Sequence, residues 1–259
     1  MGLTIEHQPL DLEHRDGRNE ARSDRATDSG WGELYKEIAD PFIAALLFVA
    51  LAPVILLLIV LVRATSRGPA IYKQIRLGRD GRPYLIYKIR TMTHDCERLT
   101  GPQWSTARDP RVTAVGRFLR RTHLDELPQI WNVMRGEMGL VGPRPERPEF
   151  VAKLEREIPG YRERLRVRPG ITGLAQVQLP PDEEIEDVRR KVTCDLCYIQ
   201  RKSPWLDLRI LMATTMKVAG FPLDLTRQLL ILPGILESTL DEDGSNPSTH
   251  GSMACLRST

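Results

Sequence analysis

The feature that most constrains this chain is an uninterrupted apolar run from Pro41 to Val62, which reads PFIAALLFVALAPVILLLIVLV. The run holds no charged and no polar side chain. About 20 such residues are enough to cross the hydrocarbon core of a bilayer as a helix. The region before the run is long and acidic, unlike the short basic start of a secretory signal peptide. We therefore expect a membrane segment here.

A proline at position 53 leaves two geometries open for this segment. Proline removes a backbone donor and clashes with the preceding turn, so a helix is expected to bend there. The segment is either a kinked helix that spans the bilayer or a helix-break-helix that returns to the face it entered. Physical chemistry favours the span, because re-entrant backbone must find partners for the carbonyls freed at the break. Arg63, Arg67, Lys73 and Arg76 follow the segment, which predicts a C-terminal body on the cytoplasmic side.

Charge is divided unevenly along the chain. Residues 1–40 carry 5 Lys/Arg against 10 Asp/Glu, a net of −5, while the rest carries 32 against 24, a net of +8. A basic body indicates an anionic partner, such as phosphates, nucleic acid or an acidic membrane face. Residues 1–30 are polar and are predicted to be disordered. Residues 31–40 read as a short interfacial helix with aromatic side chains at headgroup depth.

The first part of the body reads as a β-hairpin over residues 70–92. Two β-rich runs flank Asp80-Gly81, which is a common turn pair. Strand alternation places Lys88 and Arg90 on one face of the second strand. Either these cations line a binding site or they belong to an ordinary solvated face.

An acidic pair follows a basic run in the stretch GRFLRRTHLDELPQ. We expect a first helix at about 112–121 and a second helix capped by Thr122, with Asp125 in capping-box position. The pair Asp125 and Glu126 then lies in the first helical turn, where the helix dipole favours the ionised forms. The pair is either functional or simply compensates the dipole.

Two proline-containing loops each present an arginine. LVGPRPERPEF (140–150) carries Arg144, which can bind a phosphate bidentately. RVRPGITGLAQV (166–177) carries Arg168 beside Gly170 and Gly173, whose amides are able to form a phosphate nest. Structured turns are the alternative for both loops. Residues 184–220 read as two helices broken near Ser203-Pro204, the second of them interfacial.

Together these motifs resemble the bacterial sugar transferases, the monotopic polyprenyl-phosphate phosphoglycosyl transferases. The matches follow the family's order over about residues 36–218: the apolar segment with its proline, YKIRTM, LDELPQ with VGPRP, VRPGITGLAQV, and a D..Y pair that begins at Asp195. Family members often carry Ser-Pro at the membrane break. This chain has Ala52-Pro53, which lacks a hydroxyl to satisfy a freed carbonyl.

The resemblance implies transfer of a sugar 1-phosphate from a UDP-sugar to polyprenyl phosphate with release of UMP. It implies a covalent intermediate on Asp125 and Mg²⁺ held by Asp125 and Glu126, with Glu126 positioning the metal or polarising the acceptor. It implies these substrate and phosphate-binding residues: Lys88, Arg90, Arg120, Arg144, Arg168, Gln176 and Asp195. It also implies that the membrane segment is re-entrant, with its break at Ala52-Pro53, on the cytoplasmic face of a bacterial plasma membrane.

The expected fold is α+β and mainly α, with a re-entrant helix-break-helix, a small β-hairpin and interfacial amphipathic helices around a cytoplasmic active site. We expect a disordered tail (1–30), an interfacial helix with the membrane segment (31–66), a catalytic domain (67–220), and a C-terminal docking segment with a disordered tail (221–259). The expected partners are the donor, the acceptor and membrane lipid, and a homodimer is compatible with the pattern.

Two other functions compete with the transferase. A membrane-anchored basic module that binds anionic lipid or nucleic acid accounts for the anchor and the basic body, but not for the acidic pair. Aromatic residues make up only 6% of the chain and form no stacking platform, which argues against nucleic acid. A nucleotide-sugar hydrolase would use the same site with water as the acceptor.

Overall fold

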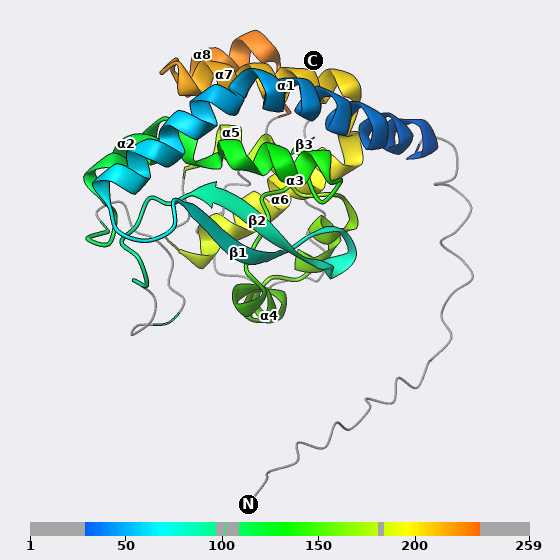
Figure 1. Cartoon of the computed structure of the whole chain (residues 1–259). Helices are drawn as coiled ribbons and strands as arrows, with labels where there is room; N and C mark the ends of the chain where they lie inside the picture. The colour runs from blue at the N-terminus through cyan, green and yellow to red at the C-terminus, as the bar shows by residue number, and fades with distance from the viewer. Residues whose placement is uncertain (1–28, 97–100, 102–108, 181–183, 234–259) are drawn as a thin grey trace, which may run out of the picture.

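The computed structural model describes residues 29–96, 101, 109–180 and 184–233 (Figure 1). The predicted tails, residues 1–30 and the end of 221–259, lie largely outside this range. The described chain is mostly helical, with two small two-stranded sheets. The α-helices are α1 (Ser29–Thr65), α2 (Ala114–Arg121), α3 (Ile130–Met134), α4 (Pro148–Glu157), α5 (Leu174–Gln178), α6 (Ile185–Arg201), α7 (Pro204–Val218) and α8 (Leu223–Leu230). The 3-10 helices are η1 (Arg79–Gly81), η2 (Leu124–Gln129) and η3 (Tyr161–Arg166), and the strands are β1 (Ile71–Leu77), β2 (Pro83–Ile89), β3 (Gly139–Val141) and β4 (Gly170–Thr172).

The apolar segment forms the greater part of α1. This helix contains both Pro41 and Pro53, and Figure 1 shows it arching over the body with its highest point between its ends. Residues 31–40, expected as a separate interfacial helix, are the first turns of the same helix. Within the described residues, α1 is the one helix long and apolar enough to cross a membrane.

Both ends of α1 and its middle contact the body. Near its start, Lys36 Nζ donates to the carbonyl of Val141 at 3.0 Å. In the middle, the ring of Phe48 lies 5.8 Å from the ring of Trp131. Near its end, Val62 is buried in a cluster with residues of β2 and α2. The helix therefore lies along the body instead of projecting from it.

The predicted hairpin is confirmed. Strand β1 pairs antiparallel with β2, with Ile71 opposite Ile89. Asp80 and Gly81 turn the chain with φ of 58° and 73°. These are left-handed values that glycine adopts freely and aspartate tolerates.

The two proline-containing loops lie side by side, because β3 and β4 form a short parallel ladder that was not predicted. A Cβ atom added to Gly170 would lie 2.1 Å from the amide nitrogen of Gly142, and one added to Gly173 would lie 2.2 Å from the carbonyl oxygen of Gly142. The amide of Gly170 donates to the carbonyl of Pro143 at 2.9 Å. These glycines therefore permit close backbone approach. Of the two alternatives for this loop, the structured turn holds at Gly170, because its amide already has a backbone partner.

The cap expected at Thr122 is wrong. The Thr122 hydroxyl bonds back to the carbonyls of Phe118 and Leu119 at the end of α2. The acidic pair instead opens η2, whose preceding residue His123 is left-handed with φ of 56°. A true N-cap serves α2, where the Thr113 hydroxyl accepts from the amide of Gly116 at 2.9 Å. The predicted break at Ser203-Pro204 is confirmed, since Ser203 caps α7 and accepts from the amide of Leu206.

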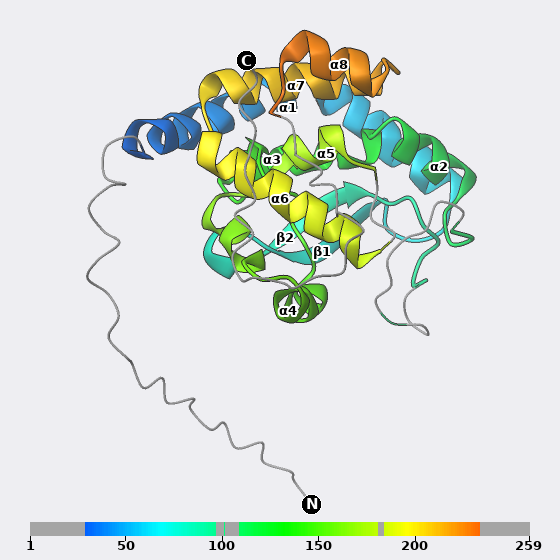
Figure 2. The ribbon, with the colours of Figure 1, turned by 180° about the vertical axis from the view of Figure 1, so that it is seen from behind.

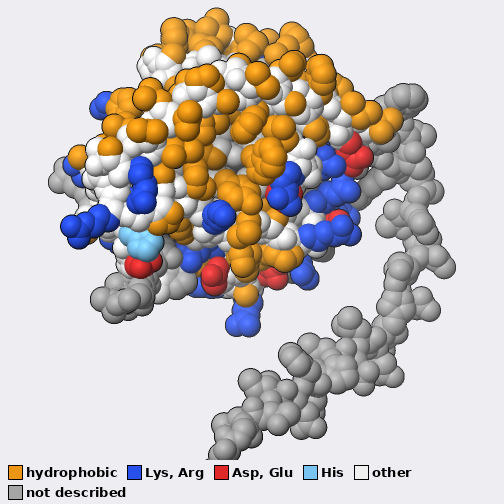
Figure 3. Space-filling view, in the orientation of Figure 1, with side chains coloured by type: hydrophobic (Ala, Val, Ile, Leu, Met, Phe, Trp, Pro, Cys, Tyr) orange, Lys and Arg blue, Asp and Glu red, His pale blue; other side chains and the backbone are white. Residues whose placement is uncertain are grey.

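One side of the molecule is apolar and the opposite side is charged. Figures 1 and 2 show α1, α7 and α8 together along one edge, and Figure 3 shows hydrophobic side chains gathered there with lysine and arginine below them. The large apolar side chains that these helices expose include Phe42, Leu46, Val49, Leu56, Leu57, Trp205, Leu208, Met212 and Leu229. Exposed apolar area of this extent marks an interaction surface.

Candidate active site

The acidic pair is buried among cations. Asp125 and Glu126 expose 7% and 8% of their surfaces. Strand β2 packs against η2 and supplies Lys88 from its end, while the loop after β3 supplies Arg144. Segments far apart in the sequence therefore meet at this pair.

Glu126 is bound by both cations. Its Oε1 accepts from Lys88 Nζ at 2.8 Å and from Arg144 Nη2 at 2.7 Å, and its Oε2 lies 3.4 Å from Arg144 Nη1. Burial by itself would raise the pKa of Glu126, but Arg144 and Lys88 together hold that pKa well below its usual range. Glu126 is therefore an ionised anchor for two cations.

Asp125 has the opposite character. Within the described part of the chain, its carboxylate takes part in no hydrogen bond and no ion pair. Burial raises the pKa of Asp125, and the charges of Lys88, Arg144 and Arg120 offset part of that rise. The expectation that the helix dipole favours ionisation of both carboxyls fails for Asp125, because desolvation outweighs it. Asp125 is therefore the carboxyl of the pair that no cation binds directly among the described residues.

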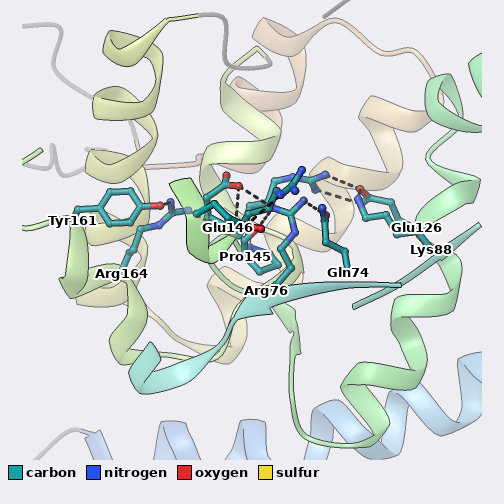
Figure 4. Close-up of polar contacts among 11 residues, drawn as sticks. Gln74, Arg76, Lys88, Glu126, Pro145, Glu146, Tyr161 and Arg164 are labelled. Atoms are coloured by element: carbon teal, nitrogen blue, oxygen red, sulfur yellow. Dashed lines mark hydrogen bonds and ion pairs between the residues drawn. The ribbon is translucent and has the colours of Figure 1, made fainter. Parts of the chain in front are cut away.

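Arg144 is mounted on a loop that is fastened to β1. Arg76 of β1 donates through Nη1 to Glu146 Oε1 at 2.8 Å and to the carbonyl of Pro145 at 3.3 Å. The amide of Leu77 donates to the carbonyl of Glu146 at 3.1 Å. Figure 4 shows the loop between the Glu126–Lys88 pair on one side and Arg164 with Tyr161 on the other. The backbone next to Arg144 is thus attached to β1 through Pro145 and Glu146.

Asp195, predicted to bind substrate, lies behind this loop. Its Oδ2 is 2.7 Å from Arg164 Nη2, and both side chains are buried. The same Arg164 nitrogen lies 2.9 Å from the carbonyl of Arg144, and Arg164 Nη1 donates to the Tyr161 hydroxyl at 3.0 Å. Sequence reasoning missed Arg164 and Tyr161, because nothing in their local spacing marks a buried charge.

Two further predicted cations lie toward the end of α1. Arg120 Nε donates to the Thr91 hydroxyl at 2.9 Å, and its charge acts on Asp125. Arg90 donates through Nη2 to the hydroxyl and carbonyl of Ser66, at 2.7 and 3.0 Å. Arg120 therefore belongs to the surroundings of the pair, whereas Arg90 fastens the chain just after α1.

Arg168 and Gln176 do not contact the acidic pair. Arg168 Nη2 lies 3.4 Å from Glu37 at the start of α1 and faces Gly136, beyond the far end of α3. Gln176 donates to the carbonyl of Ile171 at 2.9 Å. The polar contacts of Arg168 and Gln176 are thus to α1 and to β4, not to the acidic pair.

The carboxylates of the acidic pair fit a cation such as Mg²⁺ that takes few of its ligands from the protein. The described residues contain no group of three or more metal-ligating side chains. Mg²⁺ commonly takes one or two carboxylates and completes its shell with water and substrate phosphates. Asp125 offers a free carboxylate, whereas both oxygens of Glu126 already face cations.

A family model of the bacterial sugar transferases matches residues 31–220. The chain belongs to this family. The match covers α1 from residue 31 onward and the whole of the site described above, including the loops that carry Arg144 and Arg168.

Individual relatives match 69–73% of this chain. A UDP-glucose:undecaprenyl-phosphate glucose-1-phosphate transferase of Caulobacter vibrioides is 44% identical over 186 residues, which is 70% of this chain and 68% of the relative. A protein of the same name from Klebsiella pneumoniae is 39% identical over 73% of this chain, which spans only 41% of that relative. The exopolysaccharide production protein PSS of Rhizobium leguminosarum is 36% identical over 69% of this chain and 92% of its own length.

Proposed function

We propose that this protein is a phosphoglycosyl transferase that moves a sugar 1-phosphate from a UDP-sugar to polyprenyl phosphate and releases UMP. The observation that carries the proposal is the asymmetry of the acidic pair. Glu126 is held by Lys88 and Arg144, and Asp125 beside it is free. The family and the names of its relatives point to the same reaction.

The first step is attack by a carboxylate oxygen of Asp125 on the phosphorus next to the sugar. A bond forms between that oxygen and phosphorus, the bond from phosphorus to the bridging oxygen breaks, and UMP leaves with the electron pair. The product is an acyl phosphate of the kind formed by other aspartate nucleophiles. In the second step an oxygen of the polyprenyl phosphate attacks the same phosphorus, and the Asp125 carboxylate is released.

The cations make an anion–anion encounter possible. A carboxylate that approaches a diphosphate is repelled unless positive charge lies between or around them. Lys88, Arg144 and Arg120 surround the pair, and Glu126 keeps Lys88 and Arg144 in place before substrate arrives. Glu126 thus acts as the group that orients the cations. Mg²⁺, held by Asp125 and the substrate phosphates with Glu126 alongside, would neutralise charge on the diphosphate.

We further propose that α1 is re-entrant and that the site faces the cytoplasm. The start of α1 contacts Val141 and its end packs against β2 and α2, so both ends meet one body. In a spanning helix, one end would lie across the bilayer from that body. The cations that follow the apolar run, from Arg63 to Arg76, support a cytoplasmic position of the body.

The test is UMP release by the purified, detergent-solubilised protein with Mg²⁺, undecaprenyl phosphate and a panel of UDP-sugars. We expect release with at least one donor, and we expect it to require both the lipid and Asp125. Release that continues without the lipid would indicate the hydrolase instead. Absence of release with every donor, together with salt-sensitive binding to polyanions, would indicate the binding module.

A further inference from the structure

Helix α6 carries a buried acid that the proposed mechanism does not use. Asp195 is 1% exposed and is paired with Arg164, whose side chain is 8% exposed. Burying an ion pair costs desolvation energy, and a hydrophobic pair of similar volume is often as stable. A buried pair at this position therefore calls for an explanation other than stability.

Arg164 connects this pair to the site. Arg164 Nη2 lies 2.9 Å from the backbone carbonyl of Arg144, the residue whose guanidinium binds Glu126. Tyr161 accepts from the other arm of the Arg164 guanidinium at 3.0 Å. The planar guanidinium thus contacts Asp195 and the Arg144 backbone through Nη2 and Tyr161 through Nη1, a fixed two-nitrogen geometry that the single nitrogen of an ammonium group does not reproduce.

The Arg144 side chain needs such support. The side chain as a whole is 47% exposed, so packing alone does not confine it. Its position depends on where its backbone is held, and Arg76 fastens the loop one and two residues further on. Arg164 fastens the loop at Arg144 itself.

We propose that Arg164 and Asp195 are positioning residues that hold Arg144 at the dyad through its backbone carbonyl. Asp195 orients the Arg164 guanidinium through their ion pair. Arg164 in turn fixes the position of the loop backbone at Arg144, and with it the distance from the Arg144 guanidinium to Glu126. Neither residue touches the reacting atoms. This gives the D..Y aspartate a role behind the site instead of the substrate contact predicted for it. The kinetic part of the inference rests on the proposed transferase activity.

The first test is a double-mutant cycle on UMP release, using Asp195→Asn, Arg144→Met and the double variant. Misplacing a catalytic group by about 1 Å can cost about 100-fold in rate, so we expect Asp195→Asn to lower kcat by about that factor with a smaller change in donor KM. Because Asp195 acts through Arg144, Asp195→Asn should cause little further loss in the Arg144→Met background. Losses that multiply in the double variant would overturn the proposal.

Arg164→Lys and Arg162→Met complete the set. Lysine keeps the charge but has one nitrogen in place of the two that Arg164 uses, so we expect Arg164→Lys to retain a folded protein with reduced kcat. Arg162 lies on the same 3-10 helix, pairs with Glu155 at 3.0 Å and is 77% exposed, so Arg162→Met should leave kcat unchanged. Wild-type kcat in Arg164→Lys would overturn the proposal even if Asp195→Asn does not fold.

A second readout is independent of turnover. Amide hydrogen exchange in residues 142–147 should be faster in Arg164→Lys than in wild type or Arg162→Met, because the loop loses its attachment. Unchanged exchange there would count against the positioning role. If the wild-type protein releases no UMP with any donor, the proposed function fails, while the exchange experiment still decides whether Arg164 holds the loop.

Discussion

Two adjacent carboxyl groups in this protein have opposite electrostatic surroundings. Glu126 meets Lys88 and Arg144, whereas Asp125 is buried without a direct partner among the described residues. Neighbouring positions on a helix point in directions about 100–120° apart, so one residue reaches the cations and the other does not. Pairs of acids whose pKa values are driven apart are typical of sites that divide two roles.

Asp125→Asn should abolish turnover and stabilise the protein at neutral pH. The raised pKa of Asp125 means that folding favours the protonated carboxyl, so its ionised form costs stability as pH rises above the ordinary value of 3.8. Thermal unfolding of both proteins between pH 3 and 7 should show a higher Tm for the variant near pH 7, and the difference should vanish near pH 3. Asp80→Asn, at an exposed turn, is the control. Wild-type turnover in Asp125→Asn would contradict the nucleophile assignment.

Glu126→Gln should destabilise the protein and reduce turnover. The amide cannot balance Lys88 and Arg144, and the loss of charged hydrogen bonds costs about 2 kcal/mol. Because the pKa of Glu126 is depressed, its stabilising effect is present above the ordinary value of 4.5 and is lost as pH falls through the folded value. Denaturant unfolding should therefore show a gap between wild type and variant at pH 7 that narrows in acid. Equal stability at pH 7 would show that the two cations do not depend on Glu126.

At the scale of elements, one glycine sets the distance between α2 and the segment after β2. A Cβ atom at Gly116 would lie 1.9 Å from the carbonyl oxygen of Thr91. Thr91 also accepts a hydrogen bond from Arg120 of α2 through its hydroxyl. The close packing of α2 on Thr91 therefore positions Arg120 near enough for its charge to act on Asp125. The helix, and not only the side chain, thus positions Arg120.

Gly116→Ala should move α2 away from Thr91 and weaken the site. Overpacking of this kind typically costs about 1–3 kcal/mol. We expect a lower Tm and a loss of UMP release larger than the stability change explains, because Arg120 moves with the helix. Arg121→Ala, on the exposed side of α2, provides a comparison that should retain activity. A variant with wild-type kcat would mean that Arg120 does not need this helix position.

At the scale of the whole molecule, the apolar and charged surfaces lie on opposite sides. Helices α1, α7 and α8 form the apolar side (Figures 1 and 3). This arrangement agrees with the proposed re-entrant α1, which would place the apolar side in one leaflet. Contacts of Lys36 and Val62 with the body hold the two ends of α1 to the same side.

Pro53→Leu should favour a straight, spanning helix. Leucine restores the backbone donor that proline lacks and removes its clash with the preceding turn. We expect the N-terminus of wild type to be protected from protease added outside spheroplasts, and part of the variant population to expose an N-terminal epitope tag. Pro41→Leu, nearer the start of α1, should keep the wild-type pattern. Exposure of the tag in wild type would contradict the re-entrant proposal.

The sequence by itself determined the elements whose cause is local. The apolar run, the Asp80-Gly81 hairpin, the break before Pro204 and the acidic pair are visible because proline, glycine and hydrophobic spacing act on their neighbours. What only the tertiary structure decided is which groups meet. Glu126 binds Lys88 and Arg144 from two distant segments, Gly170 and Gly173 serve a strand contact, and Asp195 lies behind the site. Burial and charge pairing depend on these long-range contacts, so local spacing could not assign a free role to Asp125 and a bound role to Glu126.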